Sequence, residues 1–328
     1  VRNDRLTALL QDRDSPFRIA ATVMWTDLYG PNNSYGHMSI GTEPGLKSAT
    51  RDDIVKFYQA AFSPTNAALV LAGDLTADEA RKLAEDTFGK LSSQGRPSLP
   101  QATVAIASAP EKVLVVDKPN TPQTSVMVAQ VGIARSNPDF ERLNVMNQVL
   151  GGLFSSRVNM NLREAHGYSY GAFSAVYENA KEGPIEVGSQ VRTDVTGPAV
   201  AEIIKEVKGM LEKEVSDDEL RLAKESISRS LPAYFQTTQS TVATIGDLYL
   251  FDLPPDYYQE LPKRIEALSA ADVYAATKSH LSPDKMKVIA VGDRKVIDKQ
   301  LAALKLGPIG YRTPDGRPVP ANQAVKVP

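Results

Sequence analysis

The chain has 328 residues, and 37 Lys and Arg against 39 Asp and Glu give it a formal net charge of −2 at pH 7. This balance argues against a nucleic-acid-binding protein, because surfaces that bind phosphate carry a basic excess. Hydrophobic residues make up 42% and charged residues 23% of the chain, as in ordinary globular proteins. No apolar run reaches the roughly 18 residues of a membrane span, so we expect no transmembrane segment.

The sequence offers few groups that could bind a metal. It has no cysteine, which excludes disulfides, thiolate zinc sites and thiol nucleophiles. The histidines are His37, His166 and His280, and neither H-E-x-x-H nor H-x-x-E-H occurs. A zinc hydrolase takes two imidazoles from one helix face and a carboxylate base beside them. The sequence therefore predicts no metal site on this chain.

An internal repeat sets the domain organisation. Segment 50–74 (TRDDIVKFYQAAFSPTNAALVLAGD) is echoed by segment 269–293 (SAADVYAATKSHLSPDKMKVIAVGD) at a constant separation of 219 residues. Each copy predicts a capped helix, a Ser-Pro break and an apolar strand that ends at Gly-Asp. The Asp-Leu-Tyr sequence at 27–29 returns at 247–249, one residue out of step. The repeat indicates two units of one supersecondary design.

The repeat also predicts the domain boundaries. Residues 113–307 form a complete second unit, and residues 92–112, rich in Ser, Pro and Gly, are predicted to be a linker. The first unit would begin 219 residues before Val113, which lies upstream of Val1, so residues 1–91 are predicted to be only its C-terminal half. We expect a partner or additional residues to cover the sheet edge and apolar face that this half exposes. Residues 308–328 are predicted to form an extended Pro- and Gly-rich tail.

The second unit predicts an α+β fold with helices packed on one face of a largely antiparallel sheet. Strands are expected at 113–117, 125–133, 168–177 and 185–191, and helices at 139–150, 156–163, 196–214 and 217–251. A capping box from Ser216 to Glu219 opens the last of these helices, which should break near Pro232.

Three features could contact a ligand. Gly151 and Gly152 indicate a loop between two helices, which tight packing of the connection explains better than ligand contact does. Arg163 closes a predicted helix, where the helix dipole alone would favour a cation. Tyr168 and Tyr170 follow with a period of two, which predicts that they share one strand face. An Arg and a phenol presented together are donors suited to peptide carbonyls or a carboxylate.

The G-Y-S-Y-G sequence at 167–171 matches the G-x-S-x-G nucleophile elbow formally. That elbow requires a helix after the turn, whereas residues 172–177 alternate like a strand. We therefore expect Ser169 to be an ordinary strand residue.

At these residues the sequence becomes similar to a known family. Residues 150–171 (LGGLFSSRVNMNLREAHGYSYG), 191–194 (VRTD) and 230–237 (SLPAYFQT), with both strands that end at Gly-Asp, strongly resemble the insulinase/pitrilysin family of zinc metallopeptidases. The family includes mitochondrial processing peptidase and bacterial two-subunit relatives. The resemblance covers the chain up to Gly307, and it implies duplicated metallopeptidase-like domains.

The resemblance also implies a division of labour. One domain carries H-x-x-E-H, and the facing domain closes over the peptide with an Arg and a Tyr seven residues apart, here Arg163 and Tyr170. These two would support the transition state through the substrate's backbone carbonyls, and Tyr168, Gly151 and Gly152 would contact the substrate. The stretch that corresponds to the zinc helix, residues 144–148 (NVMNQ), has no ligand. The chain is predicted to be inactive alone, with no catalytic residue and no metal of its own; zinc is expected on a partner or on a missing upstream segment.

Two functions fit this resemblance. The first is a non-catalytic subunit, or C-terminal fragment, that clamps an unfolded peptide against a zinc-bearing H-x-x-E-H partner in a hetero-oligomer. The alternative is a catalytically dead scaffold like the core proteins of the bc1 complex, in which Arg163 and Tyr170 would be packing or interface residues. By similarity to exported bacterial relatives, the expected compartment is the periplasm.

Overall fold

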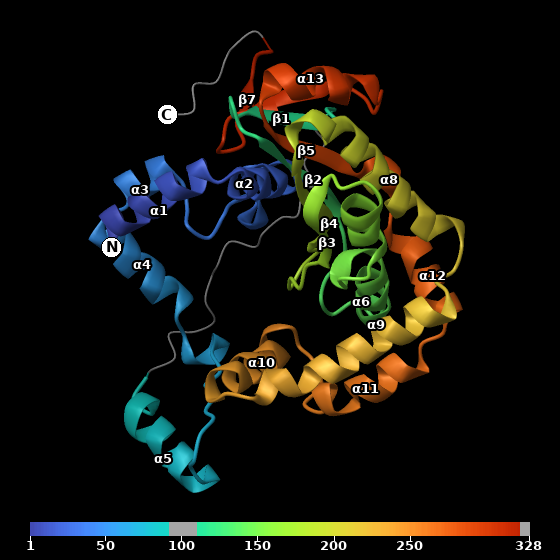
Figure 1. Cartoon of the computed structure of the whole chain (residues 1–328). Coiled ribbons are helices and arrows are strands. Elements are labelled where there is room, and N and C mark those ends of the chain that lie inside the picture. The colour runs from blue at the N-terminus through green and yellow to red at the C-terminus, as the bar shows by residue number, and fades with distance from the viewer. Residues whose placement is uncertain (92–109, 322–328) are drawn as a thin grey trace.

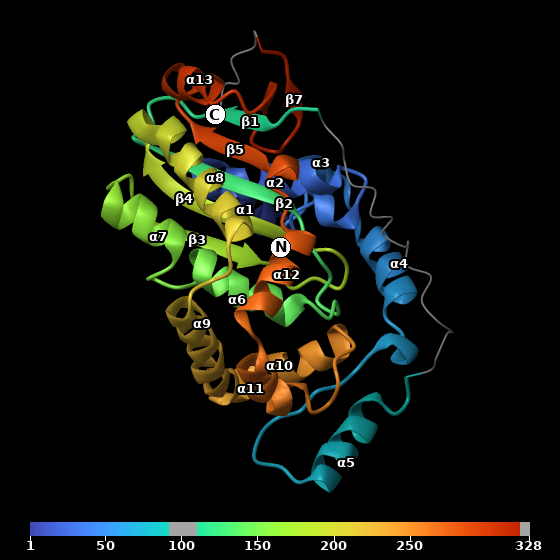
Figure 2. The same ribbon diagram turned by 90° about the vertical axis from the view of Figure 1, so that its right-hand side faces the viewer.

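The computed structural model describes residues 1–91 and 110–321, which are drawn as ribbons in Figures 1 and 2. Its centre is a seven-stranded mixed sheet with the order β3-β4-β2-β5-β1-β6-β7. The strands are β1 (Val113–Asp117), β2 (Gln123–Val131), β3 (Ser169–Val176), β4 (Pro184–Arg192), β5 (Lys287–Gly292), β6 (Ile309–Arg312) and β7 (Pro318–Val319). β1 runs parallel to β5 and β6, and the other pairs are antiparallel. The predicted α+β class is confirmed.

A helical layer covers one face of this sheet. It comprises α6 (Phe140–Asn147), α8 (Thr196–Glu212), α9 (Asp217–Ser230), α11 (Tyr257–Ala267), α12 (Ala270–His280) and α13 (Arg294–Ala303). α8 shows why these sequences pack, because Ala199, Ile203, Val207 and Met210 recur every three or four residues and are all buried. The predicted break at Pro232 is confirmed, since α9 gives way to a 3₁₀ turn (Leu231–Phe235) before α10 (Thr238–Leu250).

The opposite face of the sheet is covered by a helix from the N-terminal segment. α2 (Pro16–Tyr29) buries Ile19, Val23, Met24 and Leu28 against alternate strand residues. The strand residues in this second core are Leu114, Val116, Met127, Ala129, Ile289 and Val291. Successive strand residues point to opposite faces, so β1 and β5 serve both cores. The helices of the second unit do lie on one face, and the first segment supplies the other layer (Figure 2).

A buried ion cluster fixes α2 to the sheet. Asp27 accepts a hydrogen bond from Lys287 Nζ through one carboxylate oxygen and from Arg312 Nη2, at 3.1 Å, through the other. All three side chains are at least nine-tenths buried. Arg312 lies on β6, within the segment that was predicted to be an extended tail. That prediction is wrong for residues 309–312 and 318–319, because β6 pairs with β1 and β7 pairs with β6; residues 322–328 lie outside the described part.

The rest of the first segment packs far less. Its helices are α1 (Arg2–Asp14), α3 (Glu43–Ser48), α4 (Arg51–Ala61) and α5 (Ala77–Phe88), and none of them contains a buried residue. Residues 67–72, predicted as a strand, pair with no other strand among the described residues. The sequence pattern alone does not make a strand, since β structure also needs a neighbour to complete its hydrogen bonds. Most of the predicted linker, residues 92–109, lies outside the described residues.

Candidate functional site

The predicted site residues lie on the connection from α6 to β3. α6 continues into a π-helical turn (Gln148–Gly152), in which Gly151 is buried beneath β3. A Cβ atom on Gly151 would lie 2.3 Å from the backbone nitrogen of Ser174, so only glycine permits this close approach. Gly152 is exposed, and its Cβ would meet the end of the Gln148 side chain at 2.9 Å and the backbone oxygen of Asn147 at 3.2 Å. Packing accounts for Gly151, and substrate contact by either glycine stays a prediction.

Arg163 lies on the second π-helical turn (Met160–Ala165), which follows α7 (Arg157–Asn159). The buried side chain of Leu162 anchors this turn. The Arg163 guanidinium carbon lies 4.6 Å from the ring centroid of Phe154, and its Nε atom lies 3.3 Å from a carboxylate oxygen of Glu164. The side chain is 39% exposed. These contacts involve only part of the five N–H donors of a guanidinium.

Tyr168 and Tyr170 have different surroundings. The ring of Tyr168 stacks on His166, with centroids 4.8 Å apart, and packs against the core under the helical layer. Tyr170 is 89% exposed and lines a hollow that Phe17 of α2 also lines. The shared face expected from a period of two is therefore wrong. The ladder between β3 and β4 shifts register between Ser169 and Ala172, and such an irregularity re-aims a side chain.

Tyr170 lines a hollow of about 300 Å³ at the junction of β3, β4, β2 and α2. The lining residues are Phe17, Gln123, Tyr170, Gly171, Phe173, Ser189 and Gln190. Two aromatic rings in contact, Phe17 and Phe173, form an apolar wall with centroids 5.9 Å apart. The polar side chains are two amides, a hydroxyl and a phenol, with no carboxylate, amine, guanidinium or imidazole among them. Such groups suit the N–H and C=O groups of a peptide backbone better than a charged ligand.

Two contacts hold the connection in place against its neighbours. Asn159 donates to the carbonyl of Phe154 at 2.6 Å and accepts from the backbone nitrogen of Ala172 at 3.0 Å, which ties the turn to β3. Arg157 forms a two-bond ion pair with Glu219, at 2.7 and 2.9 Å. This pairing lowers the pKa of Glu219 to about 2. Sequence reasoning missed Asn159 and Phe17; Phe17 is distant in sequence, so no local pattern indicates it.

The stretch that corresponds to the family's zinc helix does not fit zinc. Asn147 Oδ1 already accepts a hydrogen bond from Ser174 Oγ at 2.7 Å, and the neighbouring side chains are amides, an aliphatic group and a thioether. Zinc takes imidazole, thiolate or carboxylate ligands. The histidines are apart: His280 Nε2 lies 2.9 Å from Asp139 and His166 stacks on Tyr168. Within residues 1–91 and 110–321, no three His, Cys, Asp or Glu side chains are grouped to hold a metal ion.

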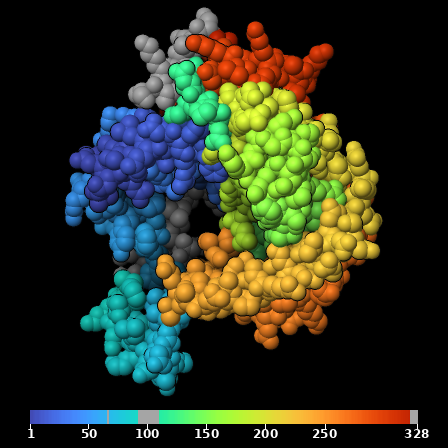
Figure 3. Space-filling model, in the orientation of Figure 1, coloured from blue at the N-terminus to red at the C-terminus, as the bar shows by residue number. Residues whose placement is uncertain are grey.

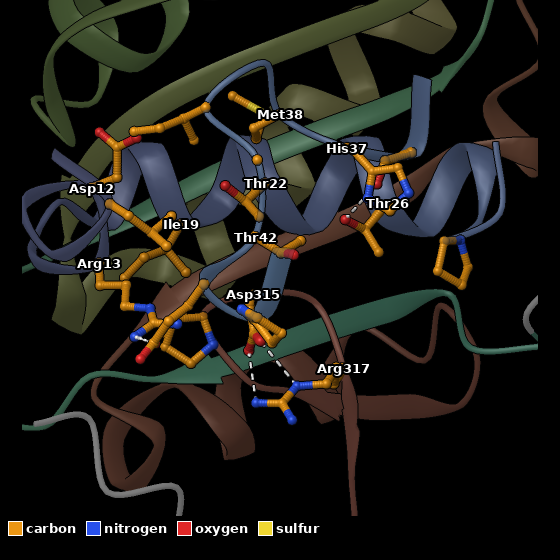
Figure 4. A pocket seen from close by; sticks show the side chains of 18 of the residues that line it. Asp12, Arg13, Ile19, Thr22, Thr26, His37, Met38, Thr42, Asp315 and Arg317 are labelled. Atoms are coloured by element: carbon orange, nitrogen blue, oxygen red, sulfur yellow. Dashed lines mark hydrogen bonds and ion pairs between the residues drawn. The ribbon is translucent and has the colours of Figure 1, made fainter. Parts of the chain in front are cut away.

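A larger hollow, of about 520 Å³, lies between α1, α2, the loop before α3 and the turn at 314–317 (Figure 4). Its charged rim is already paired, by Arg13 with Glu43 at 2.8 Å and by Arg317 with Asp315 at 2.9 Å. None of the predicted site residues lines it. We assign no chemistry to this hollow.

The chain is similar in sequence to several known proteins. Residues 48–227 match the family described as the peptidase M16 inactive domain. A Helicobacter pylori protein named non-peptidase homolog YmxG is 26% identical over 298 residues, which cover 90% of this chain and 67% of the relative. An uncharacterized zinc protease of Mycobacterium leprae is 26% identical over 238 residues, 71% of this chain and 52% of that protein. The chain thus spans between half and two thirds of these relatives.

Solved structures share the fold. The peptidase M16 inactive domain from Pseudomonas fluorescens superposes with a TM-score of 0.78 at 26% identity, covering 89% of this chain and 69% of that one. A chain of complex III2 from Candida albicans gives a TM-score of 0.77 at 13% identity, covering 92% and 73%. At that identity the second likeness concerns the fold alone. In the described part, no helix is long and apolar enough to cross a membrane.

Proposed function

Because this chain belongs to the peptidase M16 family, in which it matches the inactive domain, we propose that it is the non-catalytic part of an insulinase/pitrilysin-type zinc peptidase. In this role it clamps an extended peptide against the zinc-bearing domain or subunit of a partner. The match over residues 48–227 spans more than half of the chain and confirms the family resemblance found in the sequence. The clamp, the partner and the periplasmic location are the proposal, and cell fractionation tests the last.

The neutral hollow beside Tyr170 is the observation that supports peptide binding. An extended peptide presents N–H and C=O groups at regular intervals and no charge of its own along the backbone. The exposed phenol of Tyr170, the amides of Gln123 and Gln190 and the wall made by Phe17 and Phe173 match those needs. A peptide held here would add as a strand to a sheet edge in the partner.

The test is reconstitution with a partner that carries H-x-x-E-H. Tyr170→Phe removes one donor and keeps the ring, and Arg163→Ala removes the guanidinium. We expect each change to lower kcat by about a hundredfold if the group stabilises the transition state. A rise in KM at constant kcat would instead indicate equal binding of substrate and transition state. Arg221→Ala, on the exposed surface of α9, is the matched control and should leave turnover unchanged.

Unchanged turnover in both site variants would reject the clamp. Affinity purification then distinguishes the scaffold alternative, because a scaffold returns a large membrane complex, whereas a clamp returns a single zinc-bearing peptidase partner.

A further inference from the structure

The strand that carries Tyr170 is irregular at that residue. β3 lies at one end of the strand order, and its neighbour there is β4. Ser169 pairs with Val191 and Ala172 pairs with Ser189, so two residues of β3 stand against one of β4. Such a bulge interrupts the ladder of backbone hydrogen bonds. The direction of the Tyr170 side chain therefore depends on contacts other than strand pairing.

Two side chains hold the backbone directly after Tyr170. Ser189 Oγ donates to the carbonyl of Gly171 at 2.8 Å, and Asn159 Oδ1 accepts from the backbone nitrogen of Ala172 at 3.0 Å. The Asn159 side chain is 3% exposed, and a buried amide that loses its hydrogen bonds costs free energy. Asn159 is thus held in one orientation, and so is the strand that it binds.

The same amide group also reaches the surroundings of Arg163. Its Nδ2 atom donates to the carbonyl of Phe154 at 2.6 Å. The ring of Phe154 is 66% exposed, and the guanidinium carbon of Arg163 lies 4.6 Å from its centroid. A cation is attracted to the face of an aromatic ring at this separation. Asn159 therefore connects the residue that orders Arg163 to the strand that carries Tyr170.

This connection matters because both donors are accessible. Tyr170 is 89% exposed and the Arg163 side chain 39% exposed. In Figure 3 the lime part of the chain, to which residues 160–190 belong, borders an opening that separates it from the blue N-terminal segment. An exposed long side chain samples several rotamers, and ordering it upon binding costs free energy. Contacts that order the side chain beforehand reduce this cost.

We propose that Asn159 is a positioning residue, which holds Arg163 and Tyr170 in one arrangement, the first through Phe154 and the second through β3. The proposal rests on the clamp function, because that function assigns both donors to one peptide. Donors that are ordered before the peptide binds are aimed at the charge that develops in the transition state. Both polar atoms of the buried Asn159 side chain are engaged, so Asn159 acts through its neighbours and not on the substrate.

Spin labels test this arrangement without any peptidase activity. The chain has no cysteine, so Phe154→Cys or Tyr170→Cys places a single nitroxide label at an exposed position. Asn159→Leu keeps a side chain of similar shape and removes both hydrogen bonds. We expect the label at position 154 and the label at position 170 to tumble at least twofold faster in Asn159→Leu, because the loop and the strand lose their common anchor.

A control label and a control substitution accompany this test. Val296→Cys places a label on the exposed surface of α13, where its mobility should not change. Asn161→Ala alters the turn that carries Arg163, but Asn161 donates to two glutamates of α8 and to neither Phe154 nor β3. It should leave the label at position 170 unchanged. Unchanged mobility at both positions 154 and 170 in Asn159→Leu would overturn the proposal.

Turnover with the H-x-x-E-H partner tests what the arrangement does. Phe154→Leu removes the aromatic ring and keeps the backbone carbonyl that Asn159 binds, so the buried hydrogen bonds remain. We expect it to lower kcat about fivefold at constant KM, whereas Phe154→Trp, which keeps an aromatic face, should retain kcat. In an Arg163→Ala background, Phe154→Leu should lower kcat by less than twofold, because the guanidinium that the ring orders is gone.

The two tests distinguish this proposal from the clamp function. Equal losses of kcat from Phe154→Leu with and without Arg163 would mean that the ring only supports folding, which overturns the positioning role and leaves the clamp in place. In the opposite case, Arg163→Ala and Tyr170→Phe leave turnover unchanged while Asn159→Leu loosens both labels. The arrangement is then confirmed, and the clamp function alone is rejected.

Discussion

Glu186 is the side chain whose protonation most affects the interior. It lies on β4, is 1% exposed, and one carboxyl oxygen accepts a hydrogen bond from the Tyr177 hydroxyl at 2.9 Å. The other oxygen has no hydrogen-bond partner among the described residues. Burial raises the pKa of Glu186 to about 7, because a charge is poorly solvated there. The native state therefore holds this proton up to neutral pH.

This proton makes stability depend on pH. The folded pKa lies above the ordinary value of 4.5, so the unfolded chain releases the proton first as pH rises. We expect the contribution of Glu186 to the free energy of unfolding to be largest below pH 4.5. This contribution should fall by about 3 kcal/mol as the pH rises to 7 and stay nearly constant above it. Glu186→Gln should remove this fall, measured by urea unfolding at pH 5 and pH 8.

Glu260→Gln serves as the control, since Glu260 is exposed on α11 and should retain the pH dependence of the unchanged protein. An equally steep loss of stability in Glu186→Gln would show that another group causes it.

For single side chains, the sequence predicts which residues belong to the candidate site better than it predicts where their side chains point. The spacing of Arg163 and Tyr170 singles out both residues; Arg163 lies on the π-helical turn before β3 and Tyr170 on β3 itself. The separate surroundings of Tyr168 and Tyr170 depend on the register shift against β4, which no period-two pattern contains. Phe17 joins the hollow from α2, and the same helix covers the sheet face of Glu186; both facts require the fold.

α2 is the element that joins the first segment to the second unit, and Asp27 is its ionic anchor. Asp27→Ala removes the carboxylate that Lys287 and Arg312 share in the interior. Breaking a buried ion pair from one side costs about 3–5 kcal/mol. Trp25, the single tryptophan of the chain, lies on α2 with its ring 5.3 Å from that of Tyr177. We expect Asp27→Ala to lower the urea midpoint and to shift Trp25 emission to the red as α2 loosens.

Asp86→Ala on α5 is the matched change, because it breaks an exposed pair with Lys82, and exposed pairs contribute about 0–1 kcal/mol. If the two variants unfold at the same urea concentration, the anchor has no energetic role.

Elements follow from the sequence where their signals are local. The capping boxes at Thr50, Ser216 and Ser269 all form as predicted, because a cap involves one turn of chain. The predictions of a strand at residues 67–72 and of a tail after Gly307 are wrong because pairing between strands is not determined locally. Strand pairing is set by partners far away in sequence: residues 309–312 find β1, and residues 67–72 find no strand in the described part.

For the whole molecule, burial divides the first segment into a docked part and an undocked part. α2 buries Ile19, Val23, Met24 and Leu28 in the core it shares with the sheet, whereas α4 and α5 contain no buried residue. Local opening costs little free energy where few apolar contacts hold an element. We therefore expect brief trypsin treatment of residues 1–328 to cut within α4 and α5, at sites such as Arg51, Lys56 and Arg81, long before it cuts α8.

The fate of the fragments tests the architecture. The N-terminal piece that carries α2 should stay with the second unit and elute with it on size exclusion under native conditions, because the Asp27 cluster and the α2 core do not depend on the cut peptide bonds. The same digestion of Asp27→Ala should release that piece. Separate elution from the unchanged protein would mean that the connecting chain, rather than the α2 interface, holds the first segment in place.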